Sequence, residues 1–109
     1  MRLLPEPTPE ALTLASVLYA FGDPVRLELV RRASSEPGAP CAVEGLNVPK
    51  STLTNHWRIL REAGVVRMAA DGRYRRTWLR EDDLNGRFPG LLDAVLQLSD
   101  HERSYSAMP

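Results

Sequence analysis

The stretch KSTLTNHWRILREAGVVRMAADGRYRRTWL, residues 50–79, holds a helix pattern followed directly by a hairpin pattern. In its first half, apolar side chains recur at the spacing of a single helical face, at Leu53, Trp57, Leu60 and Ala63. We therefore predict an amphipathic helix from about Pro49 to Gly64. Short polar side chains occupy the rest of its surface near the start: Lys50, Ser51, Thr52, Thr54 and Asn55.

The second half of the stretch predicts a β-hairpin. Residues 65–70 and 73–79 are rich in β-branched and aromatic side chains, which is typical of strands. Asp71-Gly72 lies between them and is the signature of a two-residue type I′ turn. Strand alternation sends Arg73 and Arg75 to one face of the hairpin, and Tyr74 and Arg76 to the other.

Further helices are predicted on both sides of this stretch. Thr8-Pro9 and Asp23-Pro24 each combine a capping side chain with proline at the first helical position, and they predict helices to about Ala20 and Ala33. The composition of residues 34–40 indicates a loop, and residues 41–46 a short helix. A last helix is expected over 91–101, after Pro89-Gly90.

This order of elements predicts a mainly α chain with a β-hairpin, an α+β winged helix-turn-helix. The short helix, a tight link at Asn47-Val48 and the long helix form the helix-turn-helix, and the hairpin is the wing. We divide the chain into a flexible N-terminal arm over 1–7, a DNA-binding domain with its dimerisation helices over 8–101, and a disordered tail over 102–109.

The charge of the chain is segregated although its total is zero. The 109 residues include 14 basic and 14 acidic side chains. Residues 50–79 hold seven basic and two acidic side chains, whereas the segments 1–49 and 80–109 are both net acidic. Because a polyanion responds to the local surface, this distribution indicates a nucleic-acid partner in spite of the neutral total.

The long helix and the hairpin carry the side chains expected at double-stranded DNA. A helix that enters the major groove contacts base edges with polar and cationic residues near its N-terminus, and hairpin arginines contact phosphates. We predict DNA contacts from Lys50, Ser51, Thr52, Thr54, Asn55, Arg58, Arg73 and Arg75. The alternatives are a solvated helix face and a charged hairpin edge that prevents aggregation. His56 and Trp57 are interpreted as structural residues.

Three segments together resemble the arsenic-repressor (ArsR) type of winged helix-turn-helix transcriptional regulators. They are GDPVRL at 22–27, KSTLTNHWRILREAGVV at 50–66 and DGRYRRTWL at 71–79, and the resemblance extends over about residues 8–100. It implies a homodimer built on the first and last helices, DNA reading by the helix over 49–64, and repression that an inducer releases. The inducer would be an unknown small molecule.

The sequence departs from the metal-sensing members of that family. Their cysteine pair falls here on Gly38 and Pro40, with Cys41 alone beside them. The last helix has Asp93, Asp100 and His101 but lacks the second histidine and the glutamate of the other common site. We therefore expect no metal and no cofactor. Cys41 is interpreted as a buried apolar residue, with a redox role as the alternative.

The first and last helices are apolar over too wide an arc for one small core, which favours a twofold dimer. The interface residues predicted are Leu14, Leu18, Leu91, Leu92 and Val95. The function expected is that of a sequence-specific transcriptional regulator, a repressor acting on an inverted-repeat operator. The alternative is a winged-helix protein-interaction module without DNA binding. Nothing in the pattern around His56 and Cys41 indicates an enzyme.

The cellular location is predicted from two kinds of segment, membrane-spanning and secretory, that the sequence does not show. No apolar run approaches the roughly 20 residues that span a bilayer. The start of the chain, over 1–9, lacks the basic and apolar regions of a secretory signal. A cytoplasmic location and no membrane partner are therefore expected, and the single cysteine is compatible with a reducing compartment.

Overall fold

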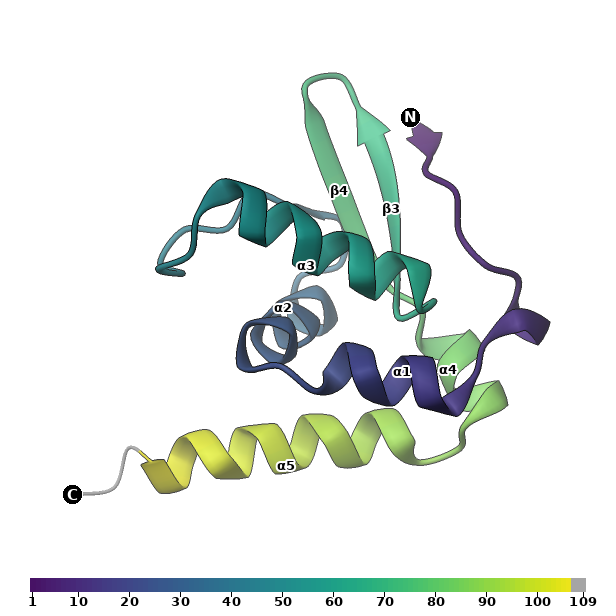
Figure 1. Ribbon diagram of the computed structural model, residues 1–109, viewed down its shortest axis with the longest axis vertical. Coiled ribbons are helices and arrows are strands. Elements are labelled where there is room, and N and C mark those ends of the chain that lie inside the picture. Colours follow the sequence, from purple (N-terminus) through teal and green to yellow (C-terminus); the bar gives the residue numbers. More distant parts are fainter. Residues whose placement is uncertain (107–109) are drawn as a thin grey trace.

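The computed structural model describes residues 1–106 (Figure 1). Its elements confirm the predicted α+β class and the order of long helix, hairpin and last helix. In chain order they are β1 (Arg2–Leu3), a 3-10 turn η1 (Pro9–Ala11), α1 (Leu14–Phe21), α2 (Pro24–Ser35), β2 (Ala39–Pro40), α3 (Lys50–Glu62), β3 (Val66–Asp71), β4 (Tyr74–Leu79), α4 (Glu81–Arg87) and α5 (Leu91–Ser106). None of the helices within residues 1–106 is long and apolar enough to cross a membrane.

The hairpin of β3 and β4 forms the centre of a four-stranded antiparallel sheet with the order β1-β3-β4-β2. Its turn differs by one residue from the prediction, because Asp71 pairs with Tyr74 and the loop is Gly72-Arg73. Only the first loop residue, Gly72, has a positive φ, of 60°. A type I′ turn needs a positive φ at both positions, so this geometry is that of type II′.

The N-terminal arm over 1–7 is fastened to the sheet instead of being loose. Arg2 is paired with Ala70, and the backbone N–H of Leu4 donates to the carbonyl of Met68 at 2.9 Å. The Leu4 side chain is buried. Glu6 accepts two hydrogen bonds of 2.8 Å from Arg67. The prediction of a flexible arm was wrong because these apolar and charged partners are supplied by a strand distant in sequence.

The first helix begins later than predicted. Thr8-Pro9 starts only the 3-10 turn η1, and α1 begins at Leu14, where the side chain of Thr13 caps the backbone N–H of Ser16. Between them the extended backbone places Leu12, 2% exposed, in the core. Leu12 packs so closely on Gly64 that a Cβ there would lie 2.0 Å from Leu12 Cδ2. Gly64 also has a φ of 82°, so two constraints require glycine at the end of α3.

Two further boundaries differ from the prediction. Residues 41–46 form no helix, because the backbone N–H of Cys41 donates to the carbonyl of Arg75 at 2.7 Å and so extends the β2–β4 pairing. Gly45 then takes a left-handed φ of 84°. At the other end, α5 continues to Ser106, so residues 102–106 of the predicted tail are helical. Residues 107–109 of that tail lie outside the described part.

The core lies between the sheet and the helices α1, α2 and α3, with α5 packed across the far side of α2 (Figure 1). Its largest fully buried side chains come from four elements and one connection: Leu29, Leu60, Val17, Val30, Val65 and Val66. Burial of each such side chain contributes about 1.5–3 kcal/mol. The apolar face of α3 predicted from residues 53–63 is thereby confirmed, with Trp57 and Leu60 buried.

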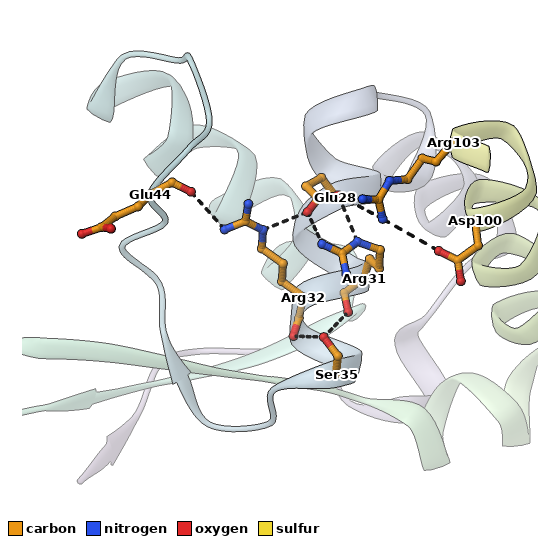
Figure 2. A network of polar contacts seen from close by, with 7 residues as sticks. All are labelled: Glu28, Arg31, Arg32, Ser35, Glu44, Asp100 and Arg103. Carbon is orange, nitrogen blue, oxygen red and sulfur yellow. Dashed lines mark hydrogen bonds and ion pairs between the residues drawn. The ribbon is translucent and has the colours of Figure 1, made fainter. Parts of the chain in front are cut away.

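A polar network on the outer surface of α2 joins three parts of the chain around Glu28 (Figure 2). The Glu28 carboxylate accepts hydrogen bonds from Arg31 and, at 2.9 Å, from Arg32 Nε. Arg103 of α5 lies 3.8 Å away. Chiefly through the Arg31 hydrogen bonds, these cations lower the pKa of Glu28 from 4.5 to about 2.

The lowered pKa predicts an acid-sensitive contribution to stability. The folded pKa lies below the unfolded one, so the stabilisation is complete above pH 4.5 and is lost as the pH falls toward about 2. We expect Glu28→Gln to lower the free energy of unfolding at neutral pH by about 2 kcal/mol and to flatten its decline in acid. Urea titrations at a series of pH values measure both effects. Glu102→Gln, at an exposed site of α5, should keep the wild-type profile, and an equally steep decline in Glu28→Gln would contradict the assignment.

Candidate nucleic-acid interface

The outer face of α3 presents the predicted base-reading residues to solvent. Lys50, Ser51, Thr52, Thr54, Asn55 and Arg58 are all exposed. On the opposite face, Trp57 is buried and its indole N–H donates to the carbonyl of Cys41 at 2.9 Å. One edge of the helix is therefore held by the core and the other is accessible along its N-terminal half.

The beginning of α3 leaves backbone donors available. Pro49 occupies the cap position and has no side-chain acceptor for the amides of the first turn. Such amides, together with the helix dipole, attract phosphate oxygens. Thr54 donates to the carbonyl of Lys50 at 3.0 Å, and Arg58 donates to both Asn55 Oδ1 and, at 3.2 Å, Glu62. These contacts hold polar side chains along the exposed face.

The arginines of the basic segment differ in their intramolecular partners. Arg67 is paired with Glu6, Arg76 bonds Asp71 and the carbonyl of Gly38, and Arg61 donates to the carbonyl of Pro5. Within residues 1–106, by contrast, the side chains of Lys50, Arg73 and Arg75 have no ion pair or hydrogen bond, and all three are exposed. Their charges are therefore available to an external anion.

The wing extends past α3 on the side of the molecule away from α5 (Figure 1). Arg75 and Tyr74 are exposed, whereas Arg76 is half-buried and Thr77 is buried. Arg73 lies in the hairpin loop itself. The polar face of α3 and the wing loop thus supply two separate elements that an elongated anion such as a duplex would contact together.

A buried arginine that sequence reasoning missed positions α3 against the corner between α1 and α2. Arg26 is 6% exposed, and its guanidinium donates to the carbonyls of Ala20 at 2.7 Å and Tyr19 at 2.9 Å. Its Nη1 lies 3.2 Å from His56 Nδ1, and Asp23 Oδ1, which caps α2, lies 3.9 Å from His56 Nε2. The structural interpretation of His56 is confirmed. The available signal was the position of Arg26, one turn before Leu29 and Val30 on the buried face of α2.

Comparisons with known proteins agree with this arrangement. A family described as a helix-turn-helix domain matches residues 21–69, from the end of α1 into β3. An uncharacterised HTH-type transcriptional regulator of Methanocaldococcus jannaschii is 31% identical over 71 residues, covering 62% of this chain and 79% of that protein. The uncharacterised HTH-type transcriptional regulator YceK of Bacillus subtilis is 31% identical over 84 residues, covering 74% and 84%.

The chain belongs to the helix-turn-helix transcriptional regulators. In this regulator the matched segment contains α2, the irregular link over 41–48 and α3. Two side-chain contacts position α3: Arg26 of α2 lies against His56, and Trp57 donates to the carbonyl of Cys41 in the link.

The residues predicted at a dimer interface divide into three groups. Leu14 and Leu18 of α1 are 49% and 46% exposed. Leu91 and Val95 of α5 are half-buried. Leu92 is only 3% exposed and packs in the core of the regulator, so it is removed from the predicted surface. On the same two helices, Tyr19, Leu98 and Tyr105 are also exposed, although they were not among the predicted interface residues.

Cys41 lies inside the regulator near the sheet. Its side chain is buried, and that burial raises the pKa of the thiol to about 11, although the positive charge of Arg75 opposes the shift. The thiol is therefore protonated at neutral pH, which disfavours the redox alternative. Within residues 1–106, no three histidine, cysteine or acidic side chains are arranged to hold a metal ion.

We expect Cys41 to be slow to react in the folded regulator. With a pKa of about 11, the thiolate fraction at pH 8 is about a hundredfold below that of an ordinary cysteine. Alkylation by iodoacetamide, followed by mass spectrometry, should therefore be slower by at least that factor in buffer than in urea. Cys41→Ser provides the unreactive control. Similar rates in buffer and in urea would show that the thiol is accessible.

Proposed function

We propose that this regulator binds double-stranded DNA through α3 and the wing, as a homodimer on an inverted-repeat operator. The observation that carries the proposal is the selective availability of positive charge. Lys50, Arg73 and Arg75 have no ion-pair partner within residues 1–106, while Arg67 and Arg76 are compensated. Unpaired cations beside a polar helix face are what phosphates and base edges require.

The polar residues of α3 divide into two roles in this proposal. Lys50, Ser51 and the first-turn amides contact phosphate near the groove edge. Thr52, Thr54 and Asn55 lie within the first two turns, where side chains meet base edges. Arg58 lies farther along, between Asn55 and Glu62, and contributes to the backbone side of the groove. Specificity comes from the second group and affinity mainly from the first and the wing.

The dimer in this proposal uses α1 and α5. Leu14 and Leu18 are exposed on α1, and Leu98 is 67% exposed on α5. Isolated surface leucines are common, but several on neighbouring helices support an interface. A twofold axis would place the two α3 helices in successive major grooves, about 34 Å apart, and would make the operator an inverted repeat.

The arsenic-repressor type and the repressor role are also part of the proposal. They rest on the three motifs at 22–27, 50–66 and 71–79, of which the first forms the corner containing Arg26. Members of that type repress until an inducer releases them, which supports repression in the cytoplasm under the control of a small molecule. Without the cysteine pair of the metal sensors, that molecule is not expected to be a metal ion.

The salt dependence of DNA binding tests the wing contact. Each phosphate contact releases counterions, so Arg75→Ala should reduce the slope of log K against log salt by about 0.9 for each bound protomer. Affinity at low salt should fall on specific and random duplexes alike. Fluorescence anisotropy with labelled DNA measures both quantities.

Arg87→Ala is the matched control for this experiment. It removes the same charge from an exposed side chain on α4, outside α3, the wing and the two helices of the proposed dimer, and it should leave the slope unchanged. An unchanged slope in Arg75→Ala would remove Arg75 from the interface. If the wild-type chain ignored DNA at low ionic strength, a protein-interaction module would become the better assignment.

The proposed dimer predicts that replacing an exposed leucine by glutamate weakens association on α1 but not on β1. Leu18→Glu places a charge on α1, and we expect it to weaken dimerisation by at least about a hundredfold because the carboxylate would be desolvated in the interface. Leu3→Glu, at a 57% exposed position on β1, is the control and should leave association unchanged. Sedimentation velocity over a range of concentrations reports both. Association unaffected by Leu18→Glu would exclude α1 from the interface.

A further inference from the structure

The pairing of the N-terminal arm with the sheet places Arg2 beside the wing. Arg2 is paired with Ala70 of β3, one residue before that strand ends, and Ala70 is paired with Arg75 of β4. Directly paired residues of antiparallel strands carry their side chains on the same face. Arg2 and Arg75 therefore lie in one row across the sheet, on either side of a small alanine. Figure 1 shows this N-terminal strand next to the wing, on the side of the molecule away from α5.

The row lies where the inner face of the sheet leaves the core and becomes accessible. Side chains alternate along a strand, so Leu4 shares the face of Arg2, and Thr77 shares the face of Arg75. Leu4 and Thr77 are buried, and Leu4 belongs to the same core as Leu60 of α3. Arg2 and Arg75 are both exposed. The two arginines are thus accessible on the side of the sheet on which α3 packs.

The charge of Arg2 is available to an external anion. Within residues 1–106, its side chain has no hydrogen bond or ion pair, which is also true of Arg75. Asp71, the acidic residue of the wing, is bonded to Arg76 instead. Neighbouring strands lie about 4.8 Å apart, so the backbones of Arg2 and Arg75 are separated by roughly 10 Å. The row therefore carries two like charges without an acid between them, an arrangement that attracts a polyanion.

The arm is held in this position by arginines of the basic segment. Arg67 of β3 donates two hydrogen bonds of 2.8 Å to Glu6, and Arg61 of α3 donates to the carbonyl of Pro5 at 2.6 Å. The hydrogen bonds from Arg67 lower the pKa of Glu6, so this carboxylate is ionised at neutral pH. Because the arm is fixed to α3 and to the wing at once, Arg2 needs little further ordering when it meets a ligand.

We propose that β1 is a third DNA-contacting element, in which Arg2 binds a phosphate of the DNA backbone beside the one bound by Arg75. This contact rests on the proposed function and adds to it a segment, residues 1–7, that the sequence pattern places outside the DNA-binding domain. A guanidinium suits the role because it donates two parallel hydrogen bonds to phosphate oxygens. Phosphate contacts carry no sequence information, so Arg2 contributes affinity and not base preference.

Salt titrations of Arg2→Ala, Arg75→Ala and the double variant test this contact, with fluorescence anisotropy of labelled DNA as the readout. Each lost phosphate contact should reduce the slope of log K against log salt by about 0.9 per bound protomer, so the double variant should lose about 1.8. Arg2→Lys keeps the charge and should retain the slope. Arg87→Ala on α4 again controls for a charge removed elsewhere. An unchanged slope in Arg2→Ala would overturn the contact.

A double-mutant cycle with Glu6 distinguishes a positioned contact from a diffuse charge. Glu6→Ala releases the arm, while Arg80, which also lies beside Glu6, keeps its ion pair with Asp83 at 2.9 Å. Arg2→Ala should weaken DNA binding by about tenfold in the wild-type chain and by less than about threefold in Glu6→Ala. An equal loss in both backgrounds would overturn the positioned contact. Thermal unfolding verifies the fold of each variant, and if Glu6→Ala does not fold, the salt titrations decide alone.

The same titrations separate this contact from the proposed function. A reduced slope in both single variants supports the two together. If Arg75→Ala lowers the slope and Arg2→Ala does not, the wing binds DNA and the arm contact alone is overturned. If neither variant changes the slope, or if the wild-type chain ignores DNA at low ionic strength, the proposed function fails and the arm contact fails with it.

Discussion

The burial of one edge of α3 is the constraint on which the rest of the structure depends. Trp57 and Leu60 are held between α2 and the sheet, and the indole N–H is fixed to the carbonyl of Cys41. Arg26 joins the same helix to the corner between α1 and α2 through His56. The opposite face carries polar side chains, and Lys50, Ser51, Thr52, Thr54 and Asn55 on it stay in solvent. The orientation of the accessible face is set by the anchored one.

Charge in this chain is organised by pairing as well as by position. The basic segment contains arginines that serve the fold: Arg67 holds the N-terminal arm through Glu6, and Arg76 joins the hairpin to the connection after α2. Outside the segment, Arg80 is buried with Asp83. A count of basic residues therefore overstates the charge available for an external anion. The cations left over gather at the start of α3 and in the wing.

Local patterns in the sequence predicted the elements that depend on near neighbours. The apolar spacing from Leu53 to Ala63 placed α3 within one or two residues, and the hairpin was located from its strands. Asp23 capped α2 as expected, with hydrogen bonds to the N–H groups of Val25 and Arg26. The exposure of the six predicted contact residues on α3 follows from the same periodicity.

What the sequence could not predict depends on contacts between distant segments. The arm over 1–7 is ordered by Met68 and Arg67, more than 60 positions away, and no local signal reveals that pairing. The expected helix at residues 41–46 is replaced by backbone pairing with Arg75. Leu92 has the same local pattern as its neighbours, yet it turns inward. Arginine is usually a surface residue. The burial of Arg26 is favourable because the carbonyls at the end of α1 accept hydrogen bonds from its guanidinium.

Hydroxyl-radical footprinting on a duplex selected by the full chain from a random pool maps where the protein contacts the DNA backbone. If both α3 helices of a dimer enter the major groove, two protected patches lie on one side of the duplex, about one helical turn (roughly 10 base pairs) apart, with additional protection where the wings reach the flanks. A single undivided patch, or no protection even at low ionic strength, would contradict this binding mode.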